Sequence, residues 1–162
     1  MEFLDVVDEN DNVVGKAEKS EVYANALLHR IVHVFVFNNY GELALQLQGK
    51  NKKFCPLHWV TSAAGHGQSG ETWKEAALRE LKEEIGIEAE LKELGKDIYQ
   101  KPETNLRKII GSFTANYDGN FYIDGHEVEA IKFFSMEEIR KMVKNGEKFH
   151  PEFLFLLEKY FS

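Results

Sequence analysis

The sequence predicts one α/β domain, of the α+β kind, in which a mixed β-sheet is packed between helices. Runs of alternating or β-branched apolar residues recur in hairpin-like pairs, and segments with helical periodicity and capping residues are spread among them. The chain has 162 residues, 43% of them hydrophobic, and no repeat or Pro/Gly/Ser-rich linker interrupts it. Residues 1–162 are therefore expected to form a single domain.

The first part of the chain is expected to supply much of the sheet. A polar loop at residues 8–12 separates two apolar segments, which is typical of a hairpin. Farther along, a β-branched and aromatic segment is followed by a turn at residues 38–41 and by an alternating return strand. The strands expected here lie at residues 3–7, 13–17, 29–37, 42–48 and 59–62.

A helix is predicted after the glycine-containing loop that follows these strands. Ser69 and Gly70 precede it, Glu71 is expected in its first turn, where the helix dipole favours negative charge, and Gly86 ends it. With 3.6 residues per turn, the apolar residues share one arc that faces the core, and the acidic residues share the adjoining arc. The acidic face is therefore expected to border the core.

That acidic face carries Glu80, Glu83 and Glu84 at positions i, i+3 and i+4, where neighbouring Cβ atoms lie about 5–6 Å apart. Like charges at this spacing destabilise a helix by roughly a few tenths of a kcal/mol, so the pattern brings no structural benefit. Hard cations such as Mg²⁺ require clustered carboxylate oxygens. The spacing therefore predicts a metal site, and Arg79 at its edge is placed to pair with Glu71 or Glu83.

Further strands and two C-terminal helices are expected after residue 87. Ser135 and Glu138 form a capping box at the start of one helix, which ends at Gly146, and Pro151 suits the first turn of the other. The strands expected here lie at residues 88–94, 96–100, 105–116 and 127–134.

The composition argues against several classes of protein. A formal net charge of −7 is unfavourable for general nucleic-acid binding. The longest apolar run, residues 31–37, is too short to span a bilayer, so no membrane partner is expected. Residues 1–5 lack the features of a signal peptide and Cys55 is the only cysteine, so we expect a cytoplasmic protein without an internal disulfide. The oligomeric state is open, with a homodimer as one candidate.

Residues 65–87 read GHGQSGETWKEAALRELKEEIGI and match every fixed position of one motif, the Nudix box. On these residues, which include Glu71 and Arg79, the chain resembles the Nudix hydrolases. The resemblance implies an α/β/α sandwich and metal-dependent cleavage of a diphosphate linkage in a nucleoside diphosphate linked to another moiety, or in a related organic diphosphate. It implies Mg²⁺ or Mn²⁺ as cofactor, held by Glu80, Glu83 and Glu84, with the Ala64 backbone carbonyl as a further ligand.

Residues outside the box match a second group in the stretches Leu28-His29-Arg30, Lys52-Lys53 and Gly65-His66. Here the chain resembles the type 1 isopentenyl diphosphate isomerases and the Nudix hydrolases similar to them. The isomerase needs a cysteine directly before the Gly-His pair, where this chain has Ala64. Its paired glutamates align with the strand that begins here with Leu106-Arg107-Lys108. These departures favour hydrolysis. The alternatives are an isomerase-like enzyme and a domain that binds nucleotides or a partner without turnover.

Five more residues are candidates for substrate binding or proton transfer. Lys52 and Lys53 could hold a diphosphate, or they could form a solvated hairpin tip. His66 could contact a phosphate or make a hydrogen bond within its loop. Strand alternation puts Glu127 and Glu129 on the same side of the sheet, so either could face the cleft as the general base. The other interpretation of these two carboxylates is an exposed strand end.

Overall fold

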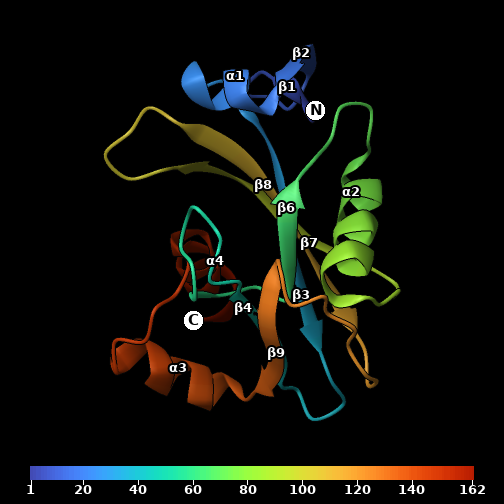
Figure 1. The fold of residues 1–162 in the computed structure, drawn as a ribbon, viewed down its shortest axis with the longest axis vertical. Helices are drawn as coiled ribbons and strands as arrows, with labels where there is room; N and C mark the ends of the chain where they lie inside the picture. The colour runs from blue at the N-terminus through green and yellow to red at the C-terminus, as the bar shows by residue number, and fades with distance from the viewer.

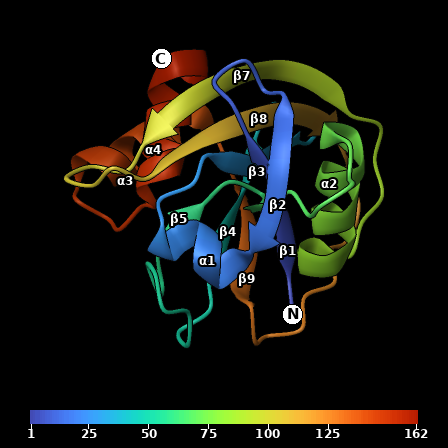
Figure 2. The ribbon, with the colours of Figure 1, turned by 90° about the horizontal axis from the view of Figure 1, so that it is seen from above.

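The computed structural model describes residues 1–162 and places nine strands in one mixed sheet with helices on both faces (Figures 1 and 2). The expected α/β/α sandwich is confirmed. Helix α2 (Trp73–Glu80) covers one face, and helices α3 (Met136–Lys144) and α4 (Pro151–Phe161) cover the other, as Figure 2 shows from above. No helix is long and apolar enough to cross a membrane.

The sheet is built around β3 (His29–Phe37). The other strands are β1 (Phe3–Val7), β2 (Val13–Glu18), β4 (Leu43–Gln48), β5 (Trp59–Val60), β6 (Ala63–His66), β7 (Lys92–Gln100), β8 (Arg107–Asn116) and β9 (Val128–Phe134). β3 pairs in parallel with β8 and antiparallel with β1, β4 and β6, which makes the sheet mixed. β1 also pairs with β2, β8 with β7, and β4 with both β5 and β9.

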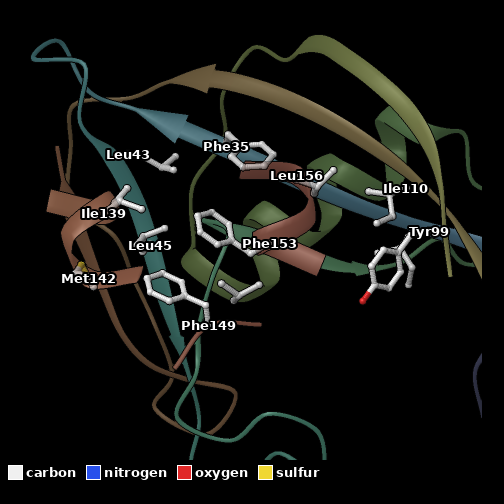
Figure 3. Close-up of a cluster of buried hydrophobic side chains, with 12 residues drawn as sticks. Phe35, Leu43, Leu45, Tyr99, Ile110, Ile139, Met142, Phe149, Phe153 and Leu156 are labelled. Carbon is white, nitrogen blue, oxygen red and sulfur yellow. The ribbon is translucent and has the colours of Figure 1, made fainter. Parts of the chain in front are cut away.

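Alternation along β3 divides the core between the two faces of the sheet. Ile31 and Phe35 belong to the cluster under α3 and α4, whereas Val32 and Val34 belong to the cluster under α2. Figure 3 shows the first cluster, in which the ring of Phe35 lies 6.3 Å from that of Phe153 on α4. Because both faces are buried, a slip of one residue would exchange the two sets of side chains, and the register is therefore fixed.

β3 and β4 separate directly after the turn that joins them. Their ladder has the single pair Phe37 and Leu43, after which β3 pairs with β6 and β4 pairs with β5 and β9. The Ser62 hydroxyl accepts from the Val36 N–H at 2.9 Å and donates to the Ala44 carbonyl at 2.6 Å. This side chain satisfies backbone groups that are left without ladder partners where the strands part.

Several boundaries differ from the sequence-based expectation. The strand expected at residues 88–94 is wrong, because residues 88–91 lie outside any strand and β7 continues through Gly95 with a bulge. A Cβ at Gly95 would collide with the Tyr160 hydroxyl, so glycine here permits close packing and does not interrupt the strand. Of the strand expected at residues 59–62, only residues 59–60 form a strand, β5, and β6 begins after it at Ala63. Helix α1 (Lys19–Ala24) was not predicted.

Helix α2 also differs from the expectation at both ends. Its N-cap is Thr72, which forms a capping box with Glu75, so Glu71 lies before the helix and not in its first turn. Its last turn is wound as a π-helix, η1 (Leu81–Ile85), and not with 3.6 residues per turn. Gly86 ends it, as predicted, and adopts the left-handed conformation with φ of 68°. Single π-helical turns occur frequently at functional sites.

Both C-terminal helices are confirmed with their predicted starts. Ser135 and Glu138 form the capping box of α3, and Pro151 lies in the first turn of α4. The N-cap of α4 is His150, whose Nδ1 accepts from the Glu152 backbone N–H at 3.1 Å. This cap brings two ionisable side chains to the beginning of α4.

Candidate active site

A cavity of about 1110 Å³ lies where β3 and β4 separate, and residues of both strands line it. Its wall carries two groups of ionisable side chains. The first group, called the acidic end below, consists of Arg79, Glu80, Glu83, Glu84 and Glu127. The second group, called the mixed-charge end, consists of Tyr23, His33, Lys101, Lys108, His150 and Glu152.

Two glutamates of the acidic end lie against the sheet. Glu80 is buried and Glu84 is half-buried, and the Glu84 carboxylate accepts from the Ala64 backbone N–H at 3.0 Å and from Gln46 Nε2 at 3.1 Å. Burial raises the pKa of both carboxyls, repulsion from Glu84 raises the pKa of Glu80 further, and the Ala64 N–H opposes the shift at Glu84. Because the two groups oppose each other's ionisation, a bound cation would relieve their repulsion.

Gly65 allows the helix to approach β6 this closely. A Cβ at this position would collide with the carboxylate of Glu80. The glycine is therefore required for space, and it leaves the backbone of β6 in direct contact with the acidic end.

Arg79 holds three glutamates at once. Its Nε and Nη2 donate to the two oxygens of Glu71 at 2.7 and 2.9 Å, and its Nη1 donates to Glu80 at 2.8 Å and to Glu83 at 3.2 Å. Nη2 also donates to the His66 carbonyl at 2.8 Å. The pairs with Glu71 and with Glu83, predicted as alternatives, therefore coexist. Both oxygens of Glu71 are used by this bidentate contact, and Glu71 does not line the cavity, which makes it a support for Arg79.

Three of the additional candidates line the cavity, and two of them lie near Glu84. Lys52 and Lys53 line the cavity, and Lys52 Nζ is 2.5 Å from a carboxylate oxygen of Glu127, which also lines it. The charge of Lys52 lowers the pKa of Glu84 and the charge of Glu127 raises it, so all three groups lie close together. The structure thus brings one carboxylate from outside the motif to the acidic end.

Glu129 does not line the cavity. The ladder between β4 and β9 pairs Gln48 with Val128 and Leu47 with Ala130, so Glu129 lies in a β-bulge. A bulge adds one residue to one strand and interrupts the alternation of side chains. The expectation that both carboxylates of this segment face the cleft is therefore wrong for Glu129.

His66 lines the cavity but is engaged in contacts within the protein. Its Nε2 lies 2.6 Å from the Tyr23 hydroxyl, and its ring stacks on that of His29 with centroids 5.7 Å apart. Burial lowers the pKa of His66 far below its usual value, so the ring is neutral at pH 7. These contacts favour the interpretation of His66 as a residue that hydrogen-bonds locally.

The mixed-charge end was not predicted from the sequence. His33 Nε2 donates to one oxygen of Glu152 at 2.9 Å, and Lys108 Nζ donates to the other at 2.7 Å. The three residues come from β3, α4 and β8, so no local spacing connects them. In the sequence, Glu152 directly follows Pro151 and is expected in the first turn of a helix. The helix dipole favours an acidic residue there, so the sequence gives no sign of a role in a site.

Comparison with known proteins agrees with the box and the fold. The family model described as the NUDIX domain matches residues 27–157. This chain belongs to the Nudix family. It is 38% identical over 161 residues to an isopentenyl-diphosphate Delta-isomerase of Serratia proteamaculans, covering 97% of this chain and 90% of that one. It is 32% identical over 166 residues to an uncharacterised Nudix hydrolase of Listeria innocua, covering 94% of this chain and 90% of that one.

A solved structure shares the whole fold of this Nudix protein. The crystal structure of a Deinococcus radiodurans protein superposes with a TM-score of 0.86 at 24% sequence identity, covering 99% of this chain and 100% of that one. The likeness shows that the arrangement of strands and helices is common to both chains.

Nudix hydrolases use divalent metal ions, and the side chains of the acidic end fit such an ion. The oxygens of Glu80, Glu83 and Glu84 are hard ligands, which Mg²⁺ and Mn²⁺ prefer. No three His, Cys, Asp or Glu side chains converge as a complete protein cage. Mg²⁺ in phosphate-processing sites does not need one, because it keeps several waters and is bound through one or two carboxylates together with substrate phosphates. The side chain of Glu83 is 60% exposed, and its contact with Arg79 uses only one of its two carboxylate oxygens.

Proposed function

We propose that this Nudix enzyme is a diphosphohydrolase that uses Mg²⁺ or Mn²⁺ to cleave a diphosphate linkage. Its substrate class is a nucleoside diphosphate linked to another moiety, or a related organic diphosphate. The observation that carries the proposal is the pair Glu80 and Glu84, which are packed against β6 in one cavity wall and raise each other's cost of ionisation. A chain that uses this wall only for packing would gain nothing from two like charges held close together there.

In this proposal each residue of the acidic end has a defined task. Glu80, Glu83 and Glu84 hold the ion, with the Ala64 carbonyl as a further ligand. An ion held there would supply positive charge to neutralise the diphosphate and to activate water at neutral pH. Arg79 keeps the glutamates oriented through its contacts with Glu80 and Glu83.

Two residues outside the motif complete the site. Glu127 accepts the proton of the attacking water, because it is the carboxylate near Glu84 that belongs neither to the helix nor to its arginine network. Lys52 pairs with Glu127 in the absence of substrate, and its ammonium group pairs with the diphosphate when substrate binds. Lys53 adds a second positive charge at the same wall. The exchange of partners by Lys52 leaves Glu127 free to act as a base.

An isomerase-like activity is the second candidate, and the similarity to the Serratia proteamaculans isomerase favours it. That reaction protonates and deprotonates carbon, and the expected acid–base residues are missing. Ala64 has no ionisable group. Leu106 is apolar, and Lys108 is bound to Glu152 at 2.7 Å, where the paired glutamates are expected. Hydrolysis needs none of these groups, and residues 65–87 retain every fixed position of the box.

The test is a panel of diphosphates assayed with Mg²⁺ or Mn²⁺ and with the products identified by mass. The panel contains nucleoside diphosphate sugars, dinucleoside polyphosphates, coenzymes, nucleoside triphosphates and prenyl diphosphates. We expect at least one compound to yield phosphate-terminated products with the natural chain and not with Glu84→Gln. Isomerisation of isopentenyl diphosphate with deuterium uptake from solvent would instead support the second candidate, and binding without any product would support a domain that only binds.

A further inference from the structure

The mixed-charge end contains a buried ion pair that hydrolysis does not use. Glu152 is 6% exposed and Lys108 has a side chain that is 11% exposed, yet both line the cavity. Replacement of such a pair by apolar residues is often neutral or stabilising, so stability alone does not require it. A buried charged pair in a cavity wall is a candidate for ligand recognition.

Both members of the pair are charged at neutral pH. Burial opposes this for Glu152, but the hydrogen bond from His33 and the charge of Lys108 hold the pKa of Glu152 well below its usual range. Burial likewise opposes the charge of Lys108, and Glu152 overcomes it and raises the pKa of Lys108. The cavity therefore offers a carboxylate and an ammonium group side by side.

The hydrogen bonds made within the protein leave several donors and acceptors free. A carboxylate has about four acceptor positions, and Glu152 uses one on each oxygen. Lys108 has three donors, of which one goes to Glu152 and one is within reach of Tyr23, so at least one remains. His150 Nδ1 accepts from a backbone N–H, and burial lowers the pKa of His150 to about 4, so the neutral ring carries its proton on Nε2 and can donate from there. Lys101 Nζ lies 4.4 Å from the centre of the Phe54 ring and is a further donor at this wall.

We infer that the mixed-charge end binds ring hydroxyl groups of the substrate, each donating to Glu152 and accepting from Lys108 or His150. This inference rests on the proposed hydrolysis of a diphosphate at the acidic end. A second phosphate would fit less well, because the Glu152 carboxylate would repel it. A prenyl chain would fit less well still, because it would remove water from the charged pair and offer no hydrogen bond in return. The hydroxyls belong either to the ribose or to a sugar on the far side of the diphosphate.

Three compounds distinguish these two sources. ADP-glucose is the parent, its 2′,3′-dideoxyribose analogue lacks the ribose hydroxyls, and the methyl ester of ADP lacks the hexose. Rates are measured with Mg²⁺, and the dissociation constants of all three are measured by calorimetry, so that recognition is determined whether or not turnover is seen. A site built to bind a hydroxyl rejects the compound that lacks it strongly, so we expect one analogue, and not both, to lose at least about tenfold in affinity and in kcat/KM.

Variants separate recognition from stability. Glu152→Gln should weaken the binding of ADP-glucose, because the charged acceptor is lost. The difference in affinity between ADP-glucose and the sensitive analogue should then fall to about threefold or less. The double variant Glu152→Leu, Lys108→Met removes the pair without leaving one charge unpaired, and it should show the same loss of discrimination if the single variant unfolds. Glu158→Gln, an exposed position on α4, is the matched control and should keep the discrimination of the natural chain.

The outcomes also separate this inference from the proposed function. If the natural chain binds and hydrolyses all three compounds within about threefold of one another, the mixed-charge end does not recognise hydroxyls, although hydrolysis stands. If the natural chain binds them with the expected discrimination but never cleaves them, hydroxyl recognition stands and the proposed hydrolysis is wrong. Failure to bind any of the three compounds contradicts this inference directly.

Discussion

The acidic end and the mixed-charge end line one cavity but are built in different ways. The acidic end places three like charges on one continuous helix, and in the proposed function a bound cation balances them. The mixed-charge end takes His33, Lys108 and Glu152 from elements that are separated by as many as 119 residues, and its charges balance one another. An unbalanced end is suited to binding a metal and a diphosphate, and a balanced end is suited to recognising neutral polar groups.

The largest effect that separates the two ends is expected from the helix glutamates. Glu84→Gln and Glu83→Gln should each lower kcat by about several hundredfold, because each removes a charge that holds the ion. Neither change opens a cavity in the core, and removal of one like charge is expected to stabilise the metal-free helix slightly. Steady-state kinetics and thermal melts measure both effects. Turnover within tenfold of the natural chain in both variants would show that this face is not the metal site.

A smaller effect is expected from the candidate base. Glu127→Gln should lower kcat by about a hundredfold and leave the metal affinity nearly unchanged, because loss of a general base affects proton transfer and not ligation. Glu129→Gln is the matched control, since Glu129 lies in the bulge outside the cavity, and it should stay close to the natural rate. Equal rates in the two variants would show that Glu127 is not the base, and Glu80 on the helix would then be the first candidate.

Acidification should lower the stability of the fold through His29, His66 and His150, whose rings burial keeps neutral. Burial lowers the pKa of His29 and of His150 to about 4 and lowers that of His66 further, whereas in the unfolded chain these groups titrate near 6.5. Their stabilising contribution is complete above pH 6.5 and is lost as the pH falls from 6.5 toward 4. For His29, which is fully buried, the loss between pH 6.5 and 5 is about 2 kcal/mol.

Thermal melts at pH 7, 6 and 5 check this pH dependence. The variant His29→Asn keeps a donor for the Leu27 carbonyl and should reduce the fall in Tm, whereas His126→Asn, at an exposed position, should leave it as it is. A Tm that does not change between pH 7 and 5 in the natural chain would contradict the burial of these rings in neutral form.

The smallest effect should come from the cap of the helix that carries the glutamates. Thr72→Ala removes the side chain that accepts from the Glu75 N–H and should cost about 1 kcal/mol of stability. Ser135→Ala at the corresponding cap of α3 should cost a similar amount. Because neither cap contacts the cavity, denaturant titrations should detect both changes while turnover stays near that of the natural chain. A large loss of activity in Thr72→Ala alone would show that the cap also positions the glutamates.

The two ends also differ in how far the sequence predicts them. The spacing of Glu80, Glu83 and Glu84 is local, so helical periodicity was enough to place them on one helix, although it could not reveal the π-helical turn that carries the last two. The start of the helix was predicted too early because Glu71 was assigned to the helix dipole, whereas Arg79 holds it before the cap. Local spacing thus predicts which side chains one element carries together, and side-chain contacts then correct the details.

Features that depend on pairing between distant elements were not accessible from the sequence. Alternation predicted that Glu129 faces the cleft, and the bulge in the ladder with β4 prevents this. Neither the separation of β3 from β4, which Ser62 bridges, nor the contact of Glu152 with Lys108 has a counterpart in residue spacing. These features create the cavity and its mixed-charge end, and they explain why the substrate class was the least predictable part of the site.

The most direct measurement of the central claim is a calorimetric titration of Mn²⁺ into the natural chain, Glu84→Gln and Glu152→Gln. We expect the natural chain and Glu152→Gln to bind the ion with similar affinity and Glu84→Gln to bind it at least about tenfold more weakly. That result would show that the cation binds at the acidic end and that the mixed-charge end is not needed to bind it. Equal binding by all three proteins, or equal loss in both variants, would contradict this division of the cavity.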